Sequence, residues 1–254
     1  MSNPYIVKVS RYRQNPIREY PDGAHSSILD RSLLVMNAAI NCFRRAYFVR
    51  MDLKFPDDNR YPSDNRLIRL FMEEFRLERM KAGYDFFYVW VWEQNTSINH
   101  HYHCCFCFNY SETQNLYGHV AAARIVWAKL LGLIPPNATK KVINKAAKKA
   151  PVWDCTKDKD GNPQKNGLLI DINAADYDQQ YAKCFKWMSY LAKVYTKEGI
   201  PDGQRKMGST MLRLGYRSLE RPRPRPKIAP RPRPRLVIRP MVISGQVVEV
   251  PEIQ

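Results

Sequence analysis

The sequence predicts an α+β fold in which helices pack on a central, largely antiparallel sheet, followed by a disordered basic C-terminal tail. Segments with helical periodicity alternate with strand-like segments in the order α-β-α-β-β-α-β-α, which favours one sheet covered by helices. The short turn TSIN between two strand-like segments predicts a hairpin. Near the C-terminus arginine alternates with proline, a pattern that cannot build a core.

The N-terminal part of the chain predicts an arm, a helix, a strand and a second helix. Residues 1–25 contain several prolines and are expected to form the arm. A helix begins near Ser27, where a serine can cap it. A strand follows at 47–55, because YFVRMDLKF alternates and is rich in aromatic and β-branched residues. The second helix covers 66–82 and ends before a glycine.

The middle of the chain completes the pattern. A strand, the turn, and a strand rich in histidine and cysteine form the expected hairpin. A helix, a basic and turn-rich insertion, an apolar strand and a long helix follow. These segments occupy residues 85–95, 100–109, 116–133, about 134–166, 167–173 and 176–199. The predicted organisation is therefore an arm (1–25), one folded domain (26–212) and a flexible tail (213–254).

The charge of the chain favours a polyanionic partner. The 254 residues carry a formal net charge of +17 and give a pI of about 9.7. Nucleic acid is the first candidate and an anionic membrane the second. No stretch of eighteen apolar residues and no signal peptide is recognisable, so we expect a cytoplasmic protein with reduced cysteines and no membrane partner.

The tail concentrates this charge. Residues 221–240 contain seven arginines and one lysine and no acidic residue. Such a segment prefers extended polyproline conformations, and we interpret it as an arm that binds phosphates. The alternative is a solubilising spacer. The tail residues expected to contact nucleic acid are Arg221, Arg223, Arg225, Arg231, Arg233 and Arg235.

The segment HHYHCCFCF predicts a metal site. On a strand, His101 and His103 point to the same side, with their Cα atoms roughly 6–7 Å apart. Glu93, on the preceding antiparallel strand, can face the same ion. Two imidazoles and one carboxylate leave coordination positions open, which is typical of a catalytic metal. The set suits Mn²⁺ or Mg²⁺ holding a phosphate oxygen, although zinc also accepts such ligands.

Neighbouring residues are assigned other roles. Cys104, Cys105 and Cys107 are expected to fill the core, and ligation of zinc is the alternative. His100 is out of phase with the other histidines and is expected to be exposed. Asp52 either contacts the metal, positions DNA or pairs with a nearby arginine such as Arg50, itself a candidate DNA contact.

The segment SYLAK offers a nucleophile. On a helix, Tyr190 and Lys193 share one face, which also carries Lys186 and Lys197 and is therefore basic. A tyrosine hydroxyl that attacks phosphorus forms a phosphotyrosyl intermediate, which conserves the energy of the broken phosphodiester. Lys193 can balance charge at that phosphate or favour the phenolate. We expect one nucleophile, because Tyr195 lies on another side of the helix.

Together, His101-Tyr102-His103, Glu93 and YLAK resemble the HUH endonucleases, which include rolling-circle replication initiators and relaxases. More narrowly, the segments RMDLKFP, WEQNTSINHHYHCCFCFN, SYLAKVYTKE and KMGST resemble the YagK/YfjJ family, which includes inovirus gene-two-like replication proteins. The resemblance covers about residues 40–212. It implies an HUH-type sheet and a phage-type initiator that nicks single-stranded DNA through a 5′-phosphotyrosine.

Two other interpretations remain open at this point. One is a non-catalytic nucleic-acid-binding regulator on the same fold, with zinc held by histidine and cysteine. The other is a transposase-like enzyme with the same chemistry. The sequence contains no GxxxxGK[ST] phosphate-binding loop, so we expect a host helicase to unwind DNA and a host polymerase to copy it.

Overall fold

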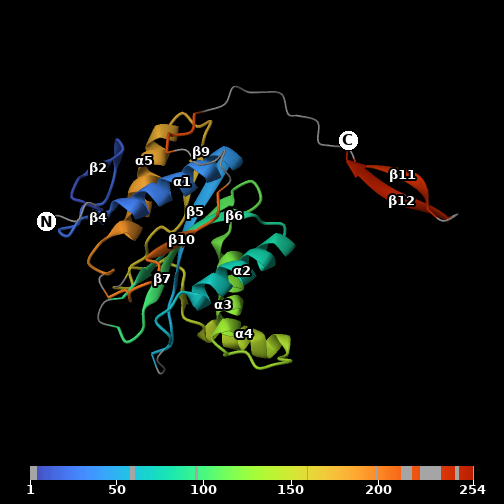
Figure 1. Cartoon of the computed structure of the whole chain (residues 1–254), viewed down its shortest axis with the longest axis horizontal. Helices are drawn as coiled ribbons and strands as arrows, with labels where there is room; N and C mark the ends of the chain where they lie inside the picture. The colour runs from blue at the N-terminus through green and yellow to red at the C-terminus, as the bar shows by residue number, and fades with distance from the viewer. Residues whose placement is uncertain are drawn as a thin grey trace. The chain divides into compact units, whose positions relative to one another are not determined.

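The computed structural model describes residues 5–57, 61–94, 97–158, 160–197, 199–212 and 219–223, together with the backbone of residues 236–243 and 246–253. The chain divides into two compact units, residues 1–222 and residues 223–254. The α+β fold class is confirmed: the described part of the first unit contains five α-helices and a six-stranded antiparallel sheet (Figure 1). Among these residues, no helix combines the length and apolar character needed to cross a membrane.

The sheet holds the predicted hairpin near its centre. Its strands follow the order β10-β6-β7-β5-β8, and β9 pairs with another part of β5. In this register Glu93 lies opposite His101, and His103 lies between Val91 on one neighbouring strand and Asp52 on the other. The strands are β5 (Arg45–Leu53), β6 (Phe86–Glu93), β7 (His101–Asn109), β8 (Val152–Trp153), β9 (Leu168–Asp171) and β10 (Met207–Ser209).

Helices cover both faces of the sheet. Helices α1 (Ser26–Cys42) and α5 (Tyr177–Met188) pack on one face, and α2 (Arg66–Lys81) and α3 (Leu116–Leu130) pack on the other. Successive side chains of β7 point to opposite faces of the sheet, as predicted. Cys105 and Cys107 lie in the core beneath α1 and α5, whereas Tyr102, Cys104, Phe106 and Phe108 lie in the core beneath α2 and α3. The three cysteines are buried and free, so their assignment to the core is confirmed.

The long helix predicted for 176–199 is wrong in its second half. Helix α5 ends at Met188 and continues as one turn of 3₁₀-helix, η1 (Ser189–Ala192). The Ser189 hydroxyl donates to the Lys186 carbonyl at 2.7 Å and accepts the backbone N–H of Arg18 at 2.8 Å, so it competes with the helical hydrogen bonds. Lys193 leaves the helix in an extended conformation and forms a β-bridge with Ala24.

The predicted arm and insertion both contain regular structure. Four short strands in the arm pair as two small sheets, β1 (Ile6–Val7) with β4 (Ala24–His25) and β2 (Arg11–Tyr12) with β3 (Asn15–Pro16). The insertion contains α4 (Lys140–Lys149), and β8 extends the central sheet. Helix α4 was not predicted, because half of its residues are lysine and its buried side consists only of the small residues Ala146 and Ala147.

In the second unit, β11 (Leu236–Ile243) pairs with β12 (Gln246–Ile253) as an antiparallel hairpin. Strand β11 therefore begins within the arginine- and proline-rich segment. The predicted DNA contacts at Arg225, Arg231, Arg233 and Arg235 lie outside the described residues and stay predictions.

Candidate metal centre and active site

The three predicted metal ligands converge at one end of the hairpin. Glu93, His101 and His103 each offer a ligand atom, and these atoms lie within 4.8 Å of one another. The Nε2 atoms of the two histidines are 3.3 Å apart, and Glu93 Oε2 lies 2.9 Å from His103 Nε2. Metal–nitrogen bonds are about 2.1 Å long, so two unprotonated nitrogens facing each other at this distance suit one shared ion. The donor set therefore fits a divalent cation with open coordination positions.

Asp52 holds His103 from the other side of its ring. Its Oδ1 lies 2.6 Å from His103 Nδ1 and 3.7 Å from Arg50 Nη2. Although burial opposes ionisation, His103 and Arg50 lower the pKa of Asp52 to about 2. An ionised Asp52 fixes the proton of the histidine on Nδ1, which leaves Nε2 available for a metal. Asp52 is thus a positioning residue, and it also makes the predicted pair with Arg50.

Charges differ between the two histidines. Burial and the neighbouring His103 lower the pKa of His101 to about 4, so His101 is neutral near pH 7. Burial would also lower the pKa of His103, but Asp52 and Glu93 outweigh it and raise that pKa. The raised pKa favours a second proton on His103, at Nε2, and a metal that binds there would replace this proton.

Glu93 is surrounded by cations. Lys193 Nζ lies 2.7 Å from Oε2, and Lys197 Nζ lies 3.0 Å from Oε1. Burial alone would raise the pKa of Glu93, but His103 and the two lysines lower it well below its usual range. Burial also lowers the pKa of Lys197 to about 8, although Glu93 opposes this effect. Lys197 is one of the predicted DNA contacts, and its side chain is buried and donates a hydrogen bond to Glu93.

Tyr190 stands directly beside this cluster. Lys193 Nζ donates a hydrogen bond of 2.7 Å to the Tyr190 hydroxyl, and the ring of His103 meets the tyrosine ring edge-on at 5.3 Å. The guanidinium carbon of Arg50 lies 4.2 Å from the ring centroid, and that of Arg18 lies 5.5 Å from it. The predicted contact between Tyr190 and Lys193 is present although this turn is a 3₁₀-helix and not an α-helix. Lys193 directly follows η1, and residues three apart in a 3₁₀-helix lie on the same side.

These side chains line one pocket of about 620 Å³. Its wall includes Asp52, Tyr190 and Lys193. It also includes the metal-ligand triad, which consists of Glu93, His101 and His103. The sequence did not indicate that Arg18, Lys54 and Trp153 also line it. Arg18 comes from the arm, and Trp153 comes from the short strand β8. Neither residue carries a pattern of its own, since only the folded chain brings them to the pocket.

The remaining predicted DNA contacts lie in different places. Arg50 lines the pocket, and Lys186 is exposed on α5. Arg221 lies 3.1 Å from Asp178 and over the ring of Tyr181, so it anchors the end of the first unit to α5. Arg223 is exposed and belongs to the second unit.

The prediction for His100 was wrong. Its side chain is buried, stacks on Trp92 at 3.8 Å, and lies 2.9 Å from the Tyr102 hydroxyl. His100 precedes β7 and therefore faces the core beneath α2 and α3 rather than the metal-ligand triad. Burial lowers the pKa of His100 to about 4, which keeps the ring neutral.

Comparison with known families gives one match. Residues 8–210 match the family model described as the YagK/YfjJ C-terminal domain. The matched range covers the sheet, the helices on both of its faces and the pocket residues. Searches of curated proteins and of solved structures gave no match.

Proposed function

We propose that this chain, which belongs to the YagK/YfjJ C-terminal domain family, initiates rolling-circle replication as an HUH-type endonuclease that nicks and rejoins single-stranded DNA. One observation carries the proposal. The amino group of Lys193 lies 2.7 Å from both the Tyr190 hydroxyl and Glu93 Oε2, so one cation joins a nucleophile to a metal ligand. This arrangement suits attack by tyrosine on a phosphodiester.

In the proposed reaction, the Tyr190 oxygen attacks the phosphorus atom and the bond from phosphorus to the 3′ oxygen breaks. The products are a 5′-phosphotyrosine and a 3′-hydroxyl, and overall the tyrosine proton passes to the 3′ oxygen. Lys193 and Arg50 stabilise negative charge that develops at the tyrosine and the phosphate. The reverse reaction, with a 3′-hydroxyl as attacking group, releases Tyr190 and rejoins the strand.

Glu93, His101 and His103 would hold the metal ion, and Asp52 would orient His103. When bound, Mn²⁺ or Mg²⁺ polarises a phosphate oxygen as a Lewis acid. The chain would depend on a host helicase and a host polymerase for unwinding and synthesis. We further propose that it acts in the cytoplasm of a bacterium, in the replication of a phage or related element.

A nicking assay on Tyr190→Phe tests the proposal. The phenylalanine keeps the ring and its contacts with His103 and Arg50 but removes the attacking oxygen. Incubation of the unmodified protein with single-stranded origin DNA and Mn²⁺ should give a covalent protein–DNA adduct, which mass spectrometry should place on Tyr190. The variant should form no adduct while its affinity for Mn²⁺ is retained.

Tyr195→Phe is the matched control. Tyr195 also lines the pocket, but the residue is 44% exposed, and a variant lacking its hydroxyl should form the adduct normally. An adduct on Tyr195, or full activity of Tyr190→Phe, would contradict the assignment. DNA binding without an adduct under any metal would instead favour the non-catalytic regulator.

A further inference from the structure

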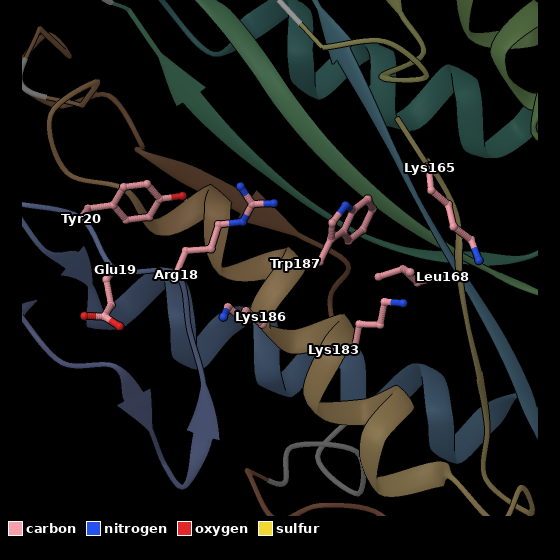
Figure 2. Close-up of a pocket in the computed structure, with 8 residues that line it drawn as sticks. All are labelled: Arg18, Glu19, Tyr20, Lys165, Leu168, Lys183, Lys186 and Trp187. Carbon is pink, nitrogen blue, oxygen red and sulfur yellow. The ribbon is translucent and has the colours of Figure 1, made fainter. Parts of the chain in front are cut away.

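A basic groove lies beside the active-site pocket and has no role in the chemistry above. It has a volume of about 600 Å³ and runs between the arm, the segment before β9 and helix α5 (Figure 2). Four cationic side chains line it: Arg18, Lys165, Lys183 and Lys186. The carboxylate that also lines it, Glu19, points away from Arg18 and Trp187 in Figure 2. The groove therefore has the charge expected of a site for a phosphate backbone.

The groove is continuous with the active-site pocket. Arg18, Lys165 and Trp187 line both cavities. The backbone N–H of Arg18 is held by the Ser189 hydroxyl at 2.8 Å, directly before Tyr190, and its guanidinium lies over the Tyr190 ring. A strand that leaves the active site along the groove would thus pass Arg18 first. Its planar guanidinium can bind a phosphate through two parallel hydrogen bonds.

Trp187 provides the contact that distinguishes a nucleic acid from other polyanions. Its indole ring is partly exposed on α5 where the two cavities meet, and Arg18 extends toward it in Figure 2. An aromatic ring in a basic groove is a platform on which an unpaired base can stack. In a duplex the faces of internal bases are already covered by their neighbours, so this platform favours single strands.

We propose that this groove binds the single-stranded DNA segment next to the scissile phosphate. In this assignment a base stacks on Trp187, Arg18 binds the adjoining phosphate, and Lys183 and Lys186 bind phosphates farther from Tyr190. The assignment rests on the proposed function for what happens at Tyr190. Binding in the groove is nevertheless a separate property, because it requires neither the hydroxyl nor the metal.

Binding can be measured on Tyr190→Phe, which cannot form the adduct, with a fluorescein-labelled deoxythymidine oligonucleotide and fluorescence anisotropy. Added Trp187→Ala should weaken binding roughly 5- to 150-fold, the range for loss of one stacked base, and Trp187→Phe should restore most of it. Tyr117→Ala is the matched control, since Tyr117 is 73% exposed on α3, and it should bind normally. Trp187 also packs against the core, so an unchanged thermal unfolding midpoint of Trp187→Ala is needed to exclude misfolding as the cause.

The lysines are tested by the salt dependence of binding. Lys183→Ala with Lys186→Ala should reduce the slope of log K against log salt by about 1.4, since each phosphate contact to a single strand contributes about 0.7. Lys145→Ala with Lys149→Ala removes the same charge from exposed positions on α4, which lies far from α5 in Figure 1, and should leave the slope unchanged.

Equal effects of the two lysine pairs, or equal binding of polyglutamate or duplex DNA, would overturn the groove assignment. The outcome is separable from that of the proposed function. Loss of groove binding in Trp187→Ala, without any adduct in the unmodified protein, would support the groove and contradict the nuclease. An adduct on Tyr190 with unchanged binding by the groove variants would support the nuclease and contradict the groove assignment.

Discussion

Replacing Asp52 by asparagine should weaken the binding of Mn²⁺ about 10-fold. The Asp52 carboxylate lies 2.6 Å from His103 Nδ1, the ring nitrogen that does not face Glu93 and His101. Loss of such an outer partner typically lowers metal affinity 10- to 100-fold. An asparagine oxygen can still accept the Nδ1 proton but carries no charge, so we expect the lower end of this range. Asp52→Ala removes the acceptor as well and should approach 100-fold, or about 2.7 kcal/mol.

Isothermal titration calorimetry with Mn²⁺ near neutral pH measures this effect directly. Asp171→Asn is the matched control, because Asp171 also pairs with an arginine at an edge of the same sheet, 3.5 Å from Arg45, but lies away from the triad. The control should bind Mn²⁺ normally. An unchanged dissociation constant in both Asp52 variants would refute the role of Asp52 in orienting His103. Equal weakening in the control would mean that the sheet, and not the contact between Asp52 and His103, sets the affinity.

Three further predictions concern the core, the cysteines and the tail. Burial lowers the pKa of His119 from 6.5 to about 4, so the unfolded chain binds a proton there before the folded chain does. Urea unfolding should accordingly show stability falling as the pH drops through this interval, with up to about 3 kcal/mol of the loss due to His119, and His119→Gln should reduce the decrease by that share. Cys105→Ser should leave the metal content measured by mass spectrometry unchanged, because burial raises the pKa of this thiol to about 12 and its neighbours are core residues; loss of bound zinc would contradict this. Truncation after Pro222 removes seven basic side chains of the tail, and if roughly half of them meet phosphates the salt slope should fall by about 2.5, whereas an unchanged slope would exclude the tail from binding.

The sequence predicted the parts of the fold that have strong periodicity. The hairpin, β5 and the helices on both faces are signalled by alternation or by helical spacing over many residues. Helix α4 and the two-residue strands of the arm lack such a signal, because their positions depend on contacts with α1, α3, α5 and η1. The end of α5 at Met188 was missed for a similar reason. It depends on the hydroxyl of Ser189, which binds Arg18, 171 residues away in sequence.

Part of the site was predictable from spacing. Alternation along a strand placed His101 beside His103, and the hairpin brought Glu93 opposite them. Helical spacing paired Tyr190 with Lys193 for a reason that holds in a 3₁₀-helix as well. Spacing could not show that Lys197 turns inward to Glu93, because the helix on which that expectation rested ends nine residues earlier, at Met188. Nor could it bring Arg18 from the arm to Tyr190.

The charges around Glu93 explain why metal and substrate should favour each other. One carboxylate faces two ammonium groups and the ring of His103, so a divalent ion adds positive charge to a site that already has an excess. A phosphodiester brings negative charge to this position and reduces the repulsion between the ion, Lys193 and Arg50. Lys193 can then leave Glu93 without losing a partner, since both the phosphate and the Tyr190 oxygen can accept its hydrogen bonds. By linkage, the ion must raise the affinity for the phosphodiester by the same factor by which the phosphodiester raises the affinity for the ion. If the proposed function is correct, the two lysines beside Glu93 would therefore make simultaneous binding of the metal and the DNA strand more favourable than binding of either alone.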